Sequence, residues 1–585
     1  MTHKNLVLSG KHSSISDLND FILNGEWILK DLDFEKIKQK KIQVFESSSY
    51  KRINRINSYK IADEIYDSVK LDLVNELNTL HSKNFSLRFW QIIFGYWLVN
   101  FIHICVERYF RIHEILKENE IQNILIRKNN NFNFSTNDTF GLNLNSINDD
   151  WENNLFYEII KFFSINKNLI IEDSSSNGFT KTFYESSEIK PNNKNKIKIF
   201  LFNIFNIFNK FNNKEVLISQ TYLPKKFEFL FHLLFFQLPT HYPLQKISYK
   251  KKDENLRRGI KLVKTEKKNL ENFVRYLIPK CLPSSLVETF ESLYKNCELV
   301  GYPKNSKTIF TSISYAYDEN FKFYTAKNVE KGARYFIGQH GNEYFTHRFS
   351  TRIELETSDK FISWGYKNSN KIISSFNLKT FKKKRKFNDQ GKLLIISYPS
   401  IHRIYSHDRY CDYKNSMLNS LLLKEKIDKN ISNQTMLRLD SDFKNNEHSF
   451  NKKILKTFNV NDLCFGENKL DKLIEKSRLC IFTFDSTGIL ENLSLNIPTL
   501  AIWKNFDNHL NDEFREKYLI LKNGKIFFDD IDELVRHINK HWKNISSWWF
   551  SKENQSFIKK FNEDFNNKGN IKSLIKLKNE IKNNE

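Results

Sequence analysis

The chain has 585 residues, 40% of them hydrophobic and 15% aromatic, so it is long enough for two or three domains and is not intrinsically disordered. Its formal net charge of +24 suits nucleic acid, an anionic membrane face or an anionic substrate, although Lys is raised together with Asn, Ile and Phe, as compositional bias would do. The sequence has no arginine-rich stripe with interleaved aromatics, no zinc-finger spacing and no helix-turn-helix pattern, which argues against nucleic acid as a partner.

The N-terminal region begins with a strand pattern that ends in a small-residue loop. Residues 5–10 (NLVLSG) predict a first strand, and Gly25-Glu26-Trp27 follows shortly after it. Because α/β sheets place ligands at the carboxyl ends of their strands, we assign Gly10 and Glu26 to a substrate-binding region.

A long apolar stretch follows at residues 85–112, with apolar side chains nearly all round a helix. This pattern predicts a buried helix or helix pair, in which Trp and Tyr pack in the core instead of lining a cofactor pocket. Its most apolar part, residues 89–105, is interrupted by Gln91, Asn100 and His103 and is too short and too polar to predict a membrane span.

Residues 196–214 are rich in Ile, Phe, Asn and Lys. A narrow polar stripe at helical spacing is consistent with a membrane-surface helix with basic flanks, or with a helix packed on a sheet, and we favour the packed helix.

The middle of the chain alternates strand and helix patterns. Residues 308–315 and 334–340 predict strands on either side of a helix, and residues 360–364 predict another strand. The second strand delivers His340 to the loop Gly338-Gln339-His340-Gly341. Histidine titrates near neutral pH and can accept a proton from a hydroxyl or hold a phosphate.

Three carboxylates lie downstream of this loop, at Glu354, Glu356 and Asp359. One of them is expected to act as a general base or to orient His340, and we assign Glu356 and Asp359 to the catalytic group with His340. The sequence leaves open whether the base is His340 or a carboxylate.

A fresh series of strands follows a basic linker. The predicted strands are residues 392–398, 436–439, 463–466, 480–484, 499–503 and 525–528. Strands separated by helical segments predict a parallel sheet in a compact domain.

The most informative stretch is Cys480 to Trp503. A buried strand leads into Asp485-Ser486-Thr487-Gly488, then into a helix that ends before Pro498. The free N–H groups and the positive dipole end of such a helix suit a phosphate, and Glu491 is placed to accept hydrogen bonds from a ribose. Arg438, at a predicted strand end, is a further phosphate candidate.

These patterns predict an α/β protein of two Rossmann-like domains, the architecture of nucleotide-sugar transferases. The expected divisions are an acceptor-side domain at 1–378 with a large helical insertion, a donor domain at 379–545, and a helical tail at 546–585 that packs back on the first domain. We expect no metal site: Asp440-Ser441-Asp442 is a weak three-letter match to DxD, and no Walker, GxSxG or HExxH motif occurs.

Five blocks in order along the chain carry a resemblance to a known family. They are residues 25–30 (GEWILK), 85–101 (FSLRFWQIIFGYWLVNF), 338–366 (with GQHGNEYF and ELETSDKFISWGY), 484–503 (FDSTGILENLSLNIPTLAIW) and 546–565 (SSWWFSKENQSFIKKFNEDF). The chain resembles the transferases assigned to bacterial lipopolysaccharide O-antigen gene clusters. It departs from them where Asn342 and Glu343 replace glycines of the usual block. More distantly, the QHG loop and the Ser/Thr-rich helix start are similar to teichoic-acid glycerophosphotransferases and to CMP-sugar-using capsule transferases.

The resemblance implies a GT-B-like glycosyltransferase that moves a sugar from a nucleotide-sugar donor, which would be its substrate and not a resident cofactor, to a cell-surface glycan. In that case His340 is the base or a phosphate contact, Ser486, Thr487, Gly488 and Glu491 hold the nucleotide, and Gln339 and Gly341 contact substrate. Alternatives are a polyol-phosphate transferase or a nucleotide-sugar epimerase of the same fold, and a non-enzymatic basic protein that binds a membrane or an anionic polymer.

The expected location is the cytoplasm or the cytoplasmic face of the inner membrane. The six cysteines are scattered without a CxxC pair, which is typical of reduced core thiols, and the N-terminal residues do not form a signal-peptide pattern.

Overall fold

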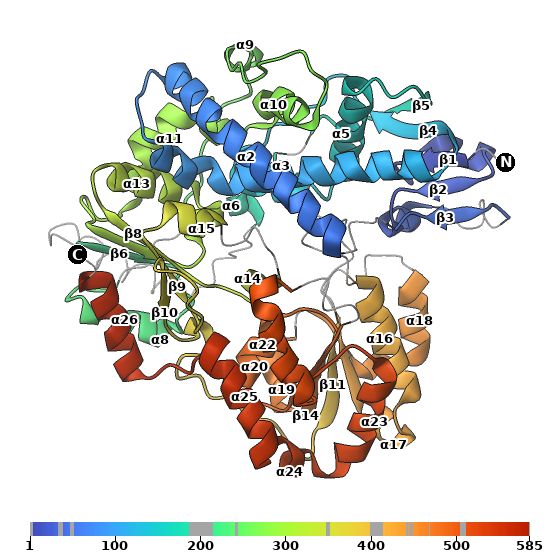
Figure 1. The fold of residues 1–585 in the computed structure, drawn as a ribbon, viewed down its shortest axis with the longest axis vertical. Helices are drawn as coiled ribbons and strands as arrows, with labels where there is room; N and C mark the ends of the chain where they lie inside the picture. The colour runs from blue at the N-terminus through green and yellow to red at the C-terminus, as the bar shows by residue number, and fades with distance from the viewer. Residues whose placement is uncertain are drawn as a thin grey trace.

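The structure is a computed structural model that describes residues 4–32, 39–46, 52–178, 180–186, 215–239, 244–346, 352–397, 413–439, 443, 449–466, 468–503 and 510–583. Within these residues the chain forms three parallel β-sheets, which we name A, B and C in chain order, with helices between them (Figure 1). The segment 196–214 and the Asp440-Ser441-Asp442 motif lie outside the described residues.

Sheet A is the N-terminal sheet. Its strands are β1 (Lys4–Val7), β2 (Phe21–Leu23), β3 (Ile42–Val44), β4 (Ile121–Lys128) and β5 (Asn168–Asp173), in the order β3-β2-β1-β4-β5. This is the Rossmann order, in which the connections change direction between β1 and β4. Such a switch point leaves a crevice at the carboxyl ends of the two central strands.

Two long helices connect β3 to β4. They are α2 (Arg52–His81) and α3 (Leu87–Glu118), which pack side by side across the upper part of the molecule (Figure 1). The Ser86 side chain caps α3 by accepting a hydrogen bond from Phe89 N. Among the described residues, α3 is the helix with the length and hydropathy of a membrane span, but 94% of its most apolar window is buried inside the protein. It is therefore the core helix that the sequence predicts.

Sheet B follows, with its strands arranged across the sheet in chain order. They are β6 (Val216–Ser219), β7 (Thr308–Thr311), β8 (Arg334–Gly338), β9 (Lys360–Ser363) and β10 (Ile372–Ser374). The helix α8 (Lys225–Leu234) follows β6, and α13 (Glu319–Glu330) connects β7 to β8. The inner strand β7 is buried from end to end and β8 is buried after its first residue, as expected for a parallel sheet covered on both faces.

Sheet C belongs to the C-terminal region. Its strands are β11 (Lys392–Ile396), β12 (Thr435–Arg438), β13 (Leu463–Cys464), β14 (Ser477–Phe482), β15 (Thr499–Ile502) and β16 (Phe527–Phe528), in the order β13-β12-β11-β14-β15-β16. This is again the Rossmann order, with its switch point between β11 and β14.

The α/β class and the two Rossmann-ordered sheets are as the sequence predicts. The difference lies in the region 1–378, which the sequence describes as one domain with a helical insertion. The structure divides it into sheets A and B, each with its own parallel pairing. Strand patterns do not show which strands pair, so the sequence predicts the strands of sheets A and B as one domain.

The C-terminal tail crosses from sheet C to sheet B. Helix α25 (Lys552–Phe565) packs on α20 (Thr487–Ser494) and α22 (Asp512–Asn523), and α26 (Ile571–Asn583) packs on α8. Between α25 and α26, Asn567 N donates to the Trp364 carbonyl at 2.7 Å, and Asn377 N donates to the Asn567 carbonyl at 2.9 Å. The tail thus joins the last two sheets through its backbone.

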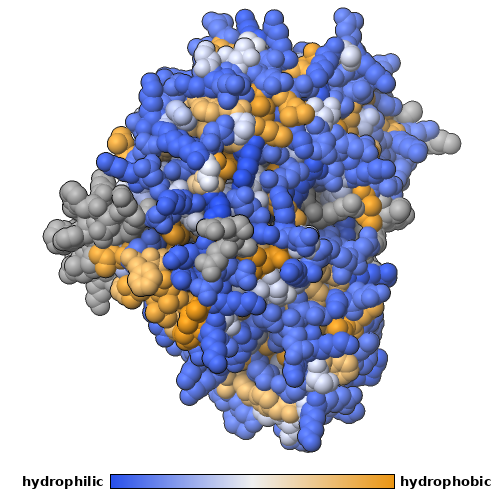
Figure 2. Space-filling model, turned by 60° about the vertical axis from the view of Figure 1, so that its left-hand side comes forward, coloured by the Kyte–Doolittle hydropathy of each residue, from blue (hydrophilic) through white to orange (hydrophobic). Residues whose placement is uncertain are grey.

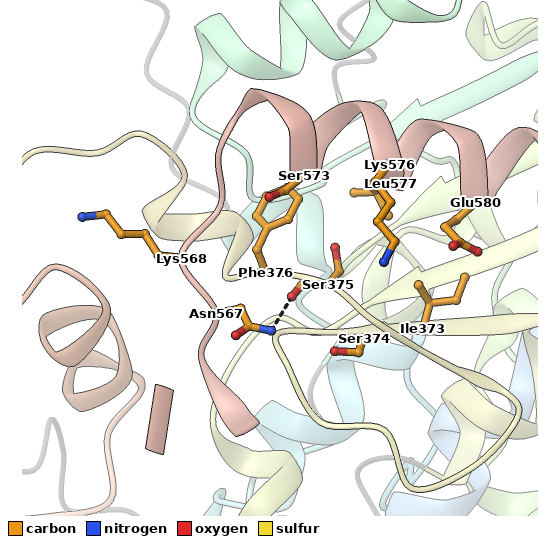
Figure 3. Close-up of a pocket in the computed structure, with 10 residues that line it drawn as sticks. All are labelled: Ile373, Ser374, Ser375, Phe376, Asn567, Lys568, Ser573, Lys576, Leu577 and Glu580. Carbon is orange, nitrogen blue, oxygen red and sulfur yellow. Dashed lines mark hydrogen bonds between the residues drawn. The ribbon is translucent and has the colours of Figure 1, made fainter. Parts of the chain in front are cut away.

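A hollow of about 280 Å³ lies between β10 and α26 (Figure 3). On its floor Asn567 Nδ2 donates to the Ser375 carbonyl at 3.0 Å, and Lys576 and Glu580 of α26 lie above. Leu577, which is buried in the apolar core of sheet B, also lines the hollow.

Candidate functional site

The loop after β8 presents His340 at the carboxyl end of the strand. Gln339, which is fully buried, fixes this loop with its whole side-chain amide: Nε2 donates to the Gly341 carbonyl at 2.8 Å, and Oε1 accepts from Trp364 N at 2.8 Å. The sequence assigned Gln339 and Gly341 to substrate contact. The structure corrects this for Gln339, because its polar atoms are used inside the protein, and places Gly341 in the loop that Gln339 holds.

His340 is joined to a buried carboxylate through a tyrosine. The Tyr344 hydroxyl lies 2.6 Å from His340 Nδ1 and donates to Glu354 Oε1 at 3.3 Å. The Tyr315 hydroxyl donates to the same oxygen at 2.6 Å. Glu354 is only 2% exposed, and these two hydroxyls satisfy its buried Oε1. Burial, and then the Glu354 carboxylate, raise the pKa of the Tyr315 phenol well above its usual value, so Tyr315 stays a donor.

We call the chain His340–Tyr344–Glu354 the relay. The other two carboxylates, which the sequence assigned to the catalytic group, lie outside it. Glu356 accepts from Gln91 Nε2 at 2.5 Å and from Arg352 Nε at 2.9 Å, which holds α15 (Arg352–Thr357) against α3. Asp359 precedes β9 and pairs with Arg88 at 2.8 Å, so it lies at the amino end of sheet B, opposite His340. Neither belongs to the group around His340. Glu354 and Glu356 are two positions apart in α15, so their side chains point to opposite sides of the helix, and Glu354 is the one that turns inward.

The loop after β14 opens α20. Ser486 is the N-cap of this helix, and its side chain accepts from Gly488 N at 3.2 Å. Ser486, Thr487 and Gly488 are half-exposed, so the positive end of the helix dipole is open to solvent. A Cβ on Gly488 would lie 2.7 Å from the Phe482 ring, so glycine is required here for the helix to pack on its own strand.

The two loops meet directly. Asn342 N donates to Thr487 Oγ1 at 3.3 Å, and Thr487 Oγ1 donates to Asn342 Oδ1 at 3.0 Å. Asn342 Nδ2 also donates to Asp485 Oδ1. The loop that carries His340 on sheet B and the helix start at the switch point of sheet C therefore form one surface, as the sequence proposed. Asn342, one of the two departures from the family's glycine-rich block, makes the connection.

Glu491 does not point to an open ribose position. Its carboxylate pairs with Lys379 at 2.8 Å and with Arg385 at 3.5 Å, both from the segment between sheets B and C. Lys379 Nζ lies 5.4 Å from the centre of the Tyr222 ring, and that ring stacks beside His340 with centroids 6.4 Å apart. Glu491, which the sequence predicts to bind the nucleotide, is thus part of a charged group that links α20 to the surroundings of His340.

Arg438 lies where the sequence placed it, at the carboxyl end of β12. It is half-buried, and its Nε has no hydrogen-bond partner among the described residues. Ile396 of β11 pairs with Arg438 on one side and with Phe482 of β14 on the other, so the guanidinium lies on the same sheet edge as the start of α20.

The two residues predicted on sheet A lie apart from this group. A Cβ on Gly10 would meet the Ile28 carbonyl at 2.6 Å, so glycine allows the loop after β1 to pack on the 3₁₀ helix Glu26–Asp31. Next to it, fully buried Ser9 donates to Asp149. Gly10 thus lies in a packed loop beside the helix that begins at Glu26, and its assignment to substrate binding stays a prediction. In the described part of the chain, no group of three or more His, Cys, Asp or Glu side chains is arranged to hold a metal ion.

Tyr344, Tyr315, Asn342, Lys379 and Tyr222 were not identified from the sequence. His340 and Tyr344 are four residues apart, but His340 lies in the loop before α14 (Glu343–Thr346), so helical spacing does not mark this pair. The others contact the site across long sequence separations and leave no local pattern.

The strand orders and the joined loops define an α/β protein of the Rossmann type with its candidate site between sheets B and C. The chain belongs to a family of transferases, described as LIC12162 family transferase, which matches residues 4–581. No curated protein matches the chain.

Two solved structures show a limited likeness. One is WaaG, a glycosyltransferase involved in lipopolysaccharide biosynthesis, with 10% identity, a TM-score of 0.28, and coverage of 51% of this chain and 96% of WaaG. The other is the spinosyn rhamnosyltransferase SpnG complexed with spinosyn aglycone, with 8% identity, a TM-score of 0.27, and coverage of 51% and 80%.

Proposed function

We propose that this transferase moves a sugar from a nucleotide-sugar donor to a hydroxyl of a glycan acceptor, at the surface formed by the loops after β8 and β14. The observation that supports the proposal is the pair of hydrogen bonds between Asn342 and Thr487, because they join the loop of His340 to the start of α20. The working division remains an acceptor side at 1–378, a donor domain at 379–545 and a tail at 546–585.

In the proposed reaction His340 Nε2 takes the proton of the acceptor hydroxyl. The hydroxyl oxygen forms a bond to the anomeric carbon, and the bond from that carbon to the donor phosphate breaks. The imidazolium that forms is stabilised by Glu354 through the Tyr344 hydroxyl, which can accept from Nδ1–H and donate to the carboxylate.

Negative charge grows on the leaving phosphate as its bond breaks. The free end of α20 at Ser486 and Thr487 would meet this charge with its N–H groups and dipole, and Arg438 and Lys379 would add positive charge. Lys379 already neutralises Glu491, so a phosphate would share it with that carboxylate. No metal is required in this scheme.

We further propose that the acceptor is a lipid-linked glycan of O-antigen synthesis and that the reaction occurs at the cytoplasmic face of the inner membrane. The family membership and the resemblance of the QHG and DSTG loops support this proposal. CMP-linked sugars are the first donors to test, because the resemblance extends to CMP-sugar-using enzymes.

A thermal-shift screen against CMP-, UDP-, GDP- and dTDP-linked sugars tests the donor class. One nucleotide class should raise Tm, and Ser486→Ala with Thr487→Ala should weaken its binding in calorimetry. No shift with any donor, or an unchanged affinity in the double variant, would contradict the proposed donor site. Product analysis with the bound donor then separates glycosyl transfer from polyol-phosphate transfer and from epimerisation.

A further inference from the structure

The outward face of α8 carries large apolar side chains in solvent. Phe229 and Leu233, one turn apart, are 46% and 43% exposed, while Phe231 on the opposite side is fully buried in the core of sheet B. Phe236, two residues after the helix, is 91% exposed and has a positive φ of 55°. This backbone is strained for a non-glycine residue, and a Phe held outward in it gains nothing from the protein's own core.

A second helix extends the apolar face. On α26, Ile571 and Ile575 are 40% and 41% exposed, and helical spacing places them on the flank away from Ser573 and Glu580, which line the hollow of Figure 3. Helices α8 and α26 contact each other. Apolar side chains gather on this face of the molecule (Figure 2), and a gathered patch of this kind marks an interaction site.

The patch has a basic border. Lys225 and Lys226 lie on the same outward side of α8 as Phe229 and Leu233, and both are exposed. Among the described residues no carboxylate forms an ion pair with either lysine. The acidic residue of this helix, Glu228, turns inward and accepts from the Thr221 hydroxyl at 2.5 Å. On α26, Lys572 is exposed next to Ile571, and Lys582 is exposed two turns beyond Ile575 on the same flank.

We propose that this face, made of the outward side of α8, Phe236 and the exposed flank of α26, docks on a bilayer of anionic phospholipid. Apolar side chains between lysines match the boundary between acyl chains and acidic headgroups. A second copy of the chain is a poorer match, because two faces with the same basic border repel each other.

The docking face is close in sequence to a residue that contacts His340. Tyr222, whose ring stacks beside His340, comes just before Pro224, where α8 begins. A bilayer on α8 would therefore bring a lipid-linked acceptor to the His340 side of the molecule. The inference deepens the proposed function, since it assigns the surface through which the membrane-borne substrate is reached.

Flotation of the full chain with phosphatidylglycerol-containing vesicles, compared with pure phosphatidylcholine vesicles, tests the proposal. Wild type should bind the anionic vesicles, and Phe229→Ser, Leu233→Ser and Phe236→Ser together should lower the partition coefficient about tenfold or more. Lys225→Ala with Lys226→Ala should lower it about fivefold per lysine at low salt and less at high salt. The matched control is Leu299→Ser with Val460→Ser, which removes two side chains that are 76% and 74% exposed elsewhere; its partition should stay at the wild-type value.

Nucleotide-sugar binding by thermal shift, measured on the same proteins, separates this inference from the proposed function. If the triple variant still binds the donor and no longer floats, the docking face is supported. Equal flotation of wild type and triple variant, or no flotation of wild type, overturns the docking face while leaving the donor site standing. A dimer in light scattering that the triple variant abolishes, without vesicle binding by wild type, would assign the face to a second copy and overturn the proposal. Vesicle binding without donor binding would instead count against the proposed function.

Discussion

Sheets A and C have the same strand order, but the loop at the switch point is half-exposed in sheet C and packed in sheet A. At the switch point of sheet C, α20 begins with half-exposed Ser486 and Thr487, which contact the loop of His340. At the switch point of sheet A the loop after the central strand β1 is packed shut, with Ser9 fully buried on Asp149 and Gly10 against a backbone carbonyl.

Next to sheet A lies a network of buried ion pairs. Arg108 pairs with Glu107 and with Glu152, and Arg111 pairs with Glu107 and donates to the Asn24 carbonyl at 2.9 Å. All four charged side chains are at most 1% exposed. The comparison teaches that strand order fixes where a ligand can bind, whereas the packing of the loops decides whether one does.

The largest expected effect is on the stability of sheet A. Arg108→Met removes the positive charge that the buried carboxylates of Glu107 and Glu152 share, which should cost about 3–5 kcal/mol of unfolding free energy. Urea unfolding measures this loss. Donor binding by the folded protein should be unchanged, and a loss of binding without a loss of stability would make the edge of sheet A a ligand site.

Two glycine substitutions, one at each sheet, test whether the two loops differ in donor binding. Gly10→Ala forces the loop away from the Ile28 carbonyl and should destabilise the fold by about 1–3 kcal/mol without changing donor affinity. Gly488→Ala pushes the start of α20 from the Phe482 ring and should weaken donor binding as well. Calorimetry and thermal unfolding of both variants provide the readouts; identical behaviour of the two would remove the distinction between the edges.

The relay is tested by two neighbouring carboxylates of α15. Glu354→Gln keeps the shape of the side chain but removes the charge that stabilises the imidazolium, so turnover should fall about tenfold and its pH profile should shift. Glu356→Gln is the control, since it touches α2 and α3 and should leave turnover and the pH profile unchanged. Equal turnover in the two variants would show that Glu354 is only a packing residue.

The last expected effects come from pH, with opposite signs near sheets A and C. Burial, and then Glu319, raise the pKa of Asp138 to about 7, so its contribution to stability is present at acidic pH and is lost as pH rises from about 4 to 7. Burial, and then His541, lower the pKa of His537 to about 4, so stability is lost as pH falls from about 6.5 to 4.

Between pH 5 and 7, Asp138→Asn should therefore remove about 2 kcal/mol of stability loss toward higher pH, and His537→Gln a similar loss toward lower pH. Chemical unfolding at several pH values measures both slopes. The same slope change in both variants would contradict the assigned directions.

Much of sheet C could be predicted from sequence because its strands are continuous apolar runs that end at turn residues. Residues 392–398 contain β11, and the small-residue loop before Thr487 marks the start of α20 as predicted. The division between sheets A and B could not be predicted, because β2 and β3 have three residues each and pairing is a long-range property. The site shows the same limit: His340 and Ser486 are visible as strand-end residues, whereas the partners of Glu491 lie in another part of the chain.

Donor turnover by His340→Gln, with water or glycan as acceptor, tests the central claim most directly. The account predicts that kcat falls at least about 100-fold while the calorimetric Kd for the donor stays within about twofold, because the imidazole moves the proton and α20 holds the nucleotide. Turnover equal to that of wild type, in a variant that still binds the donor, would contradict the claim that the loops after β8 and β14 form one catalytic site.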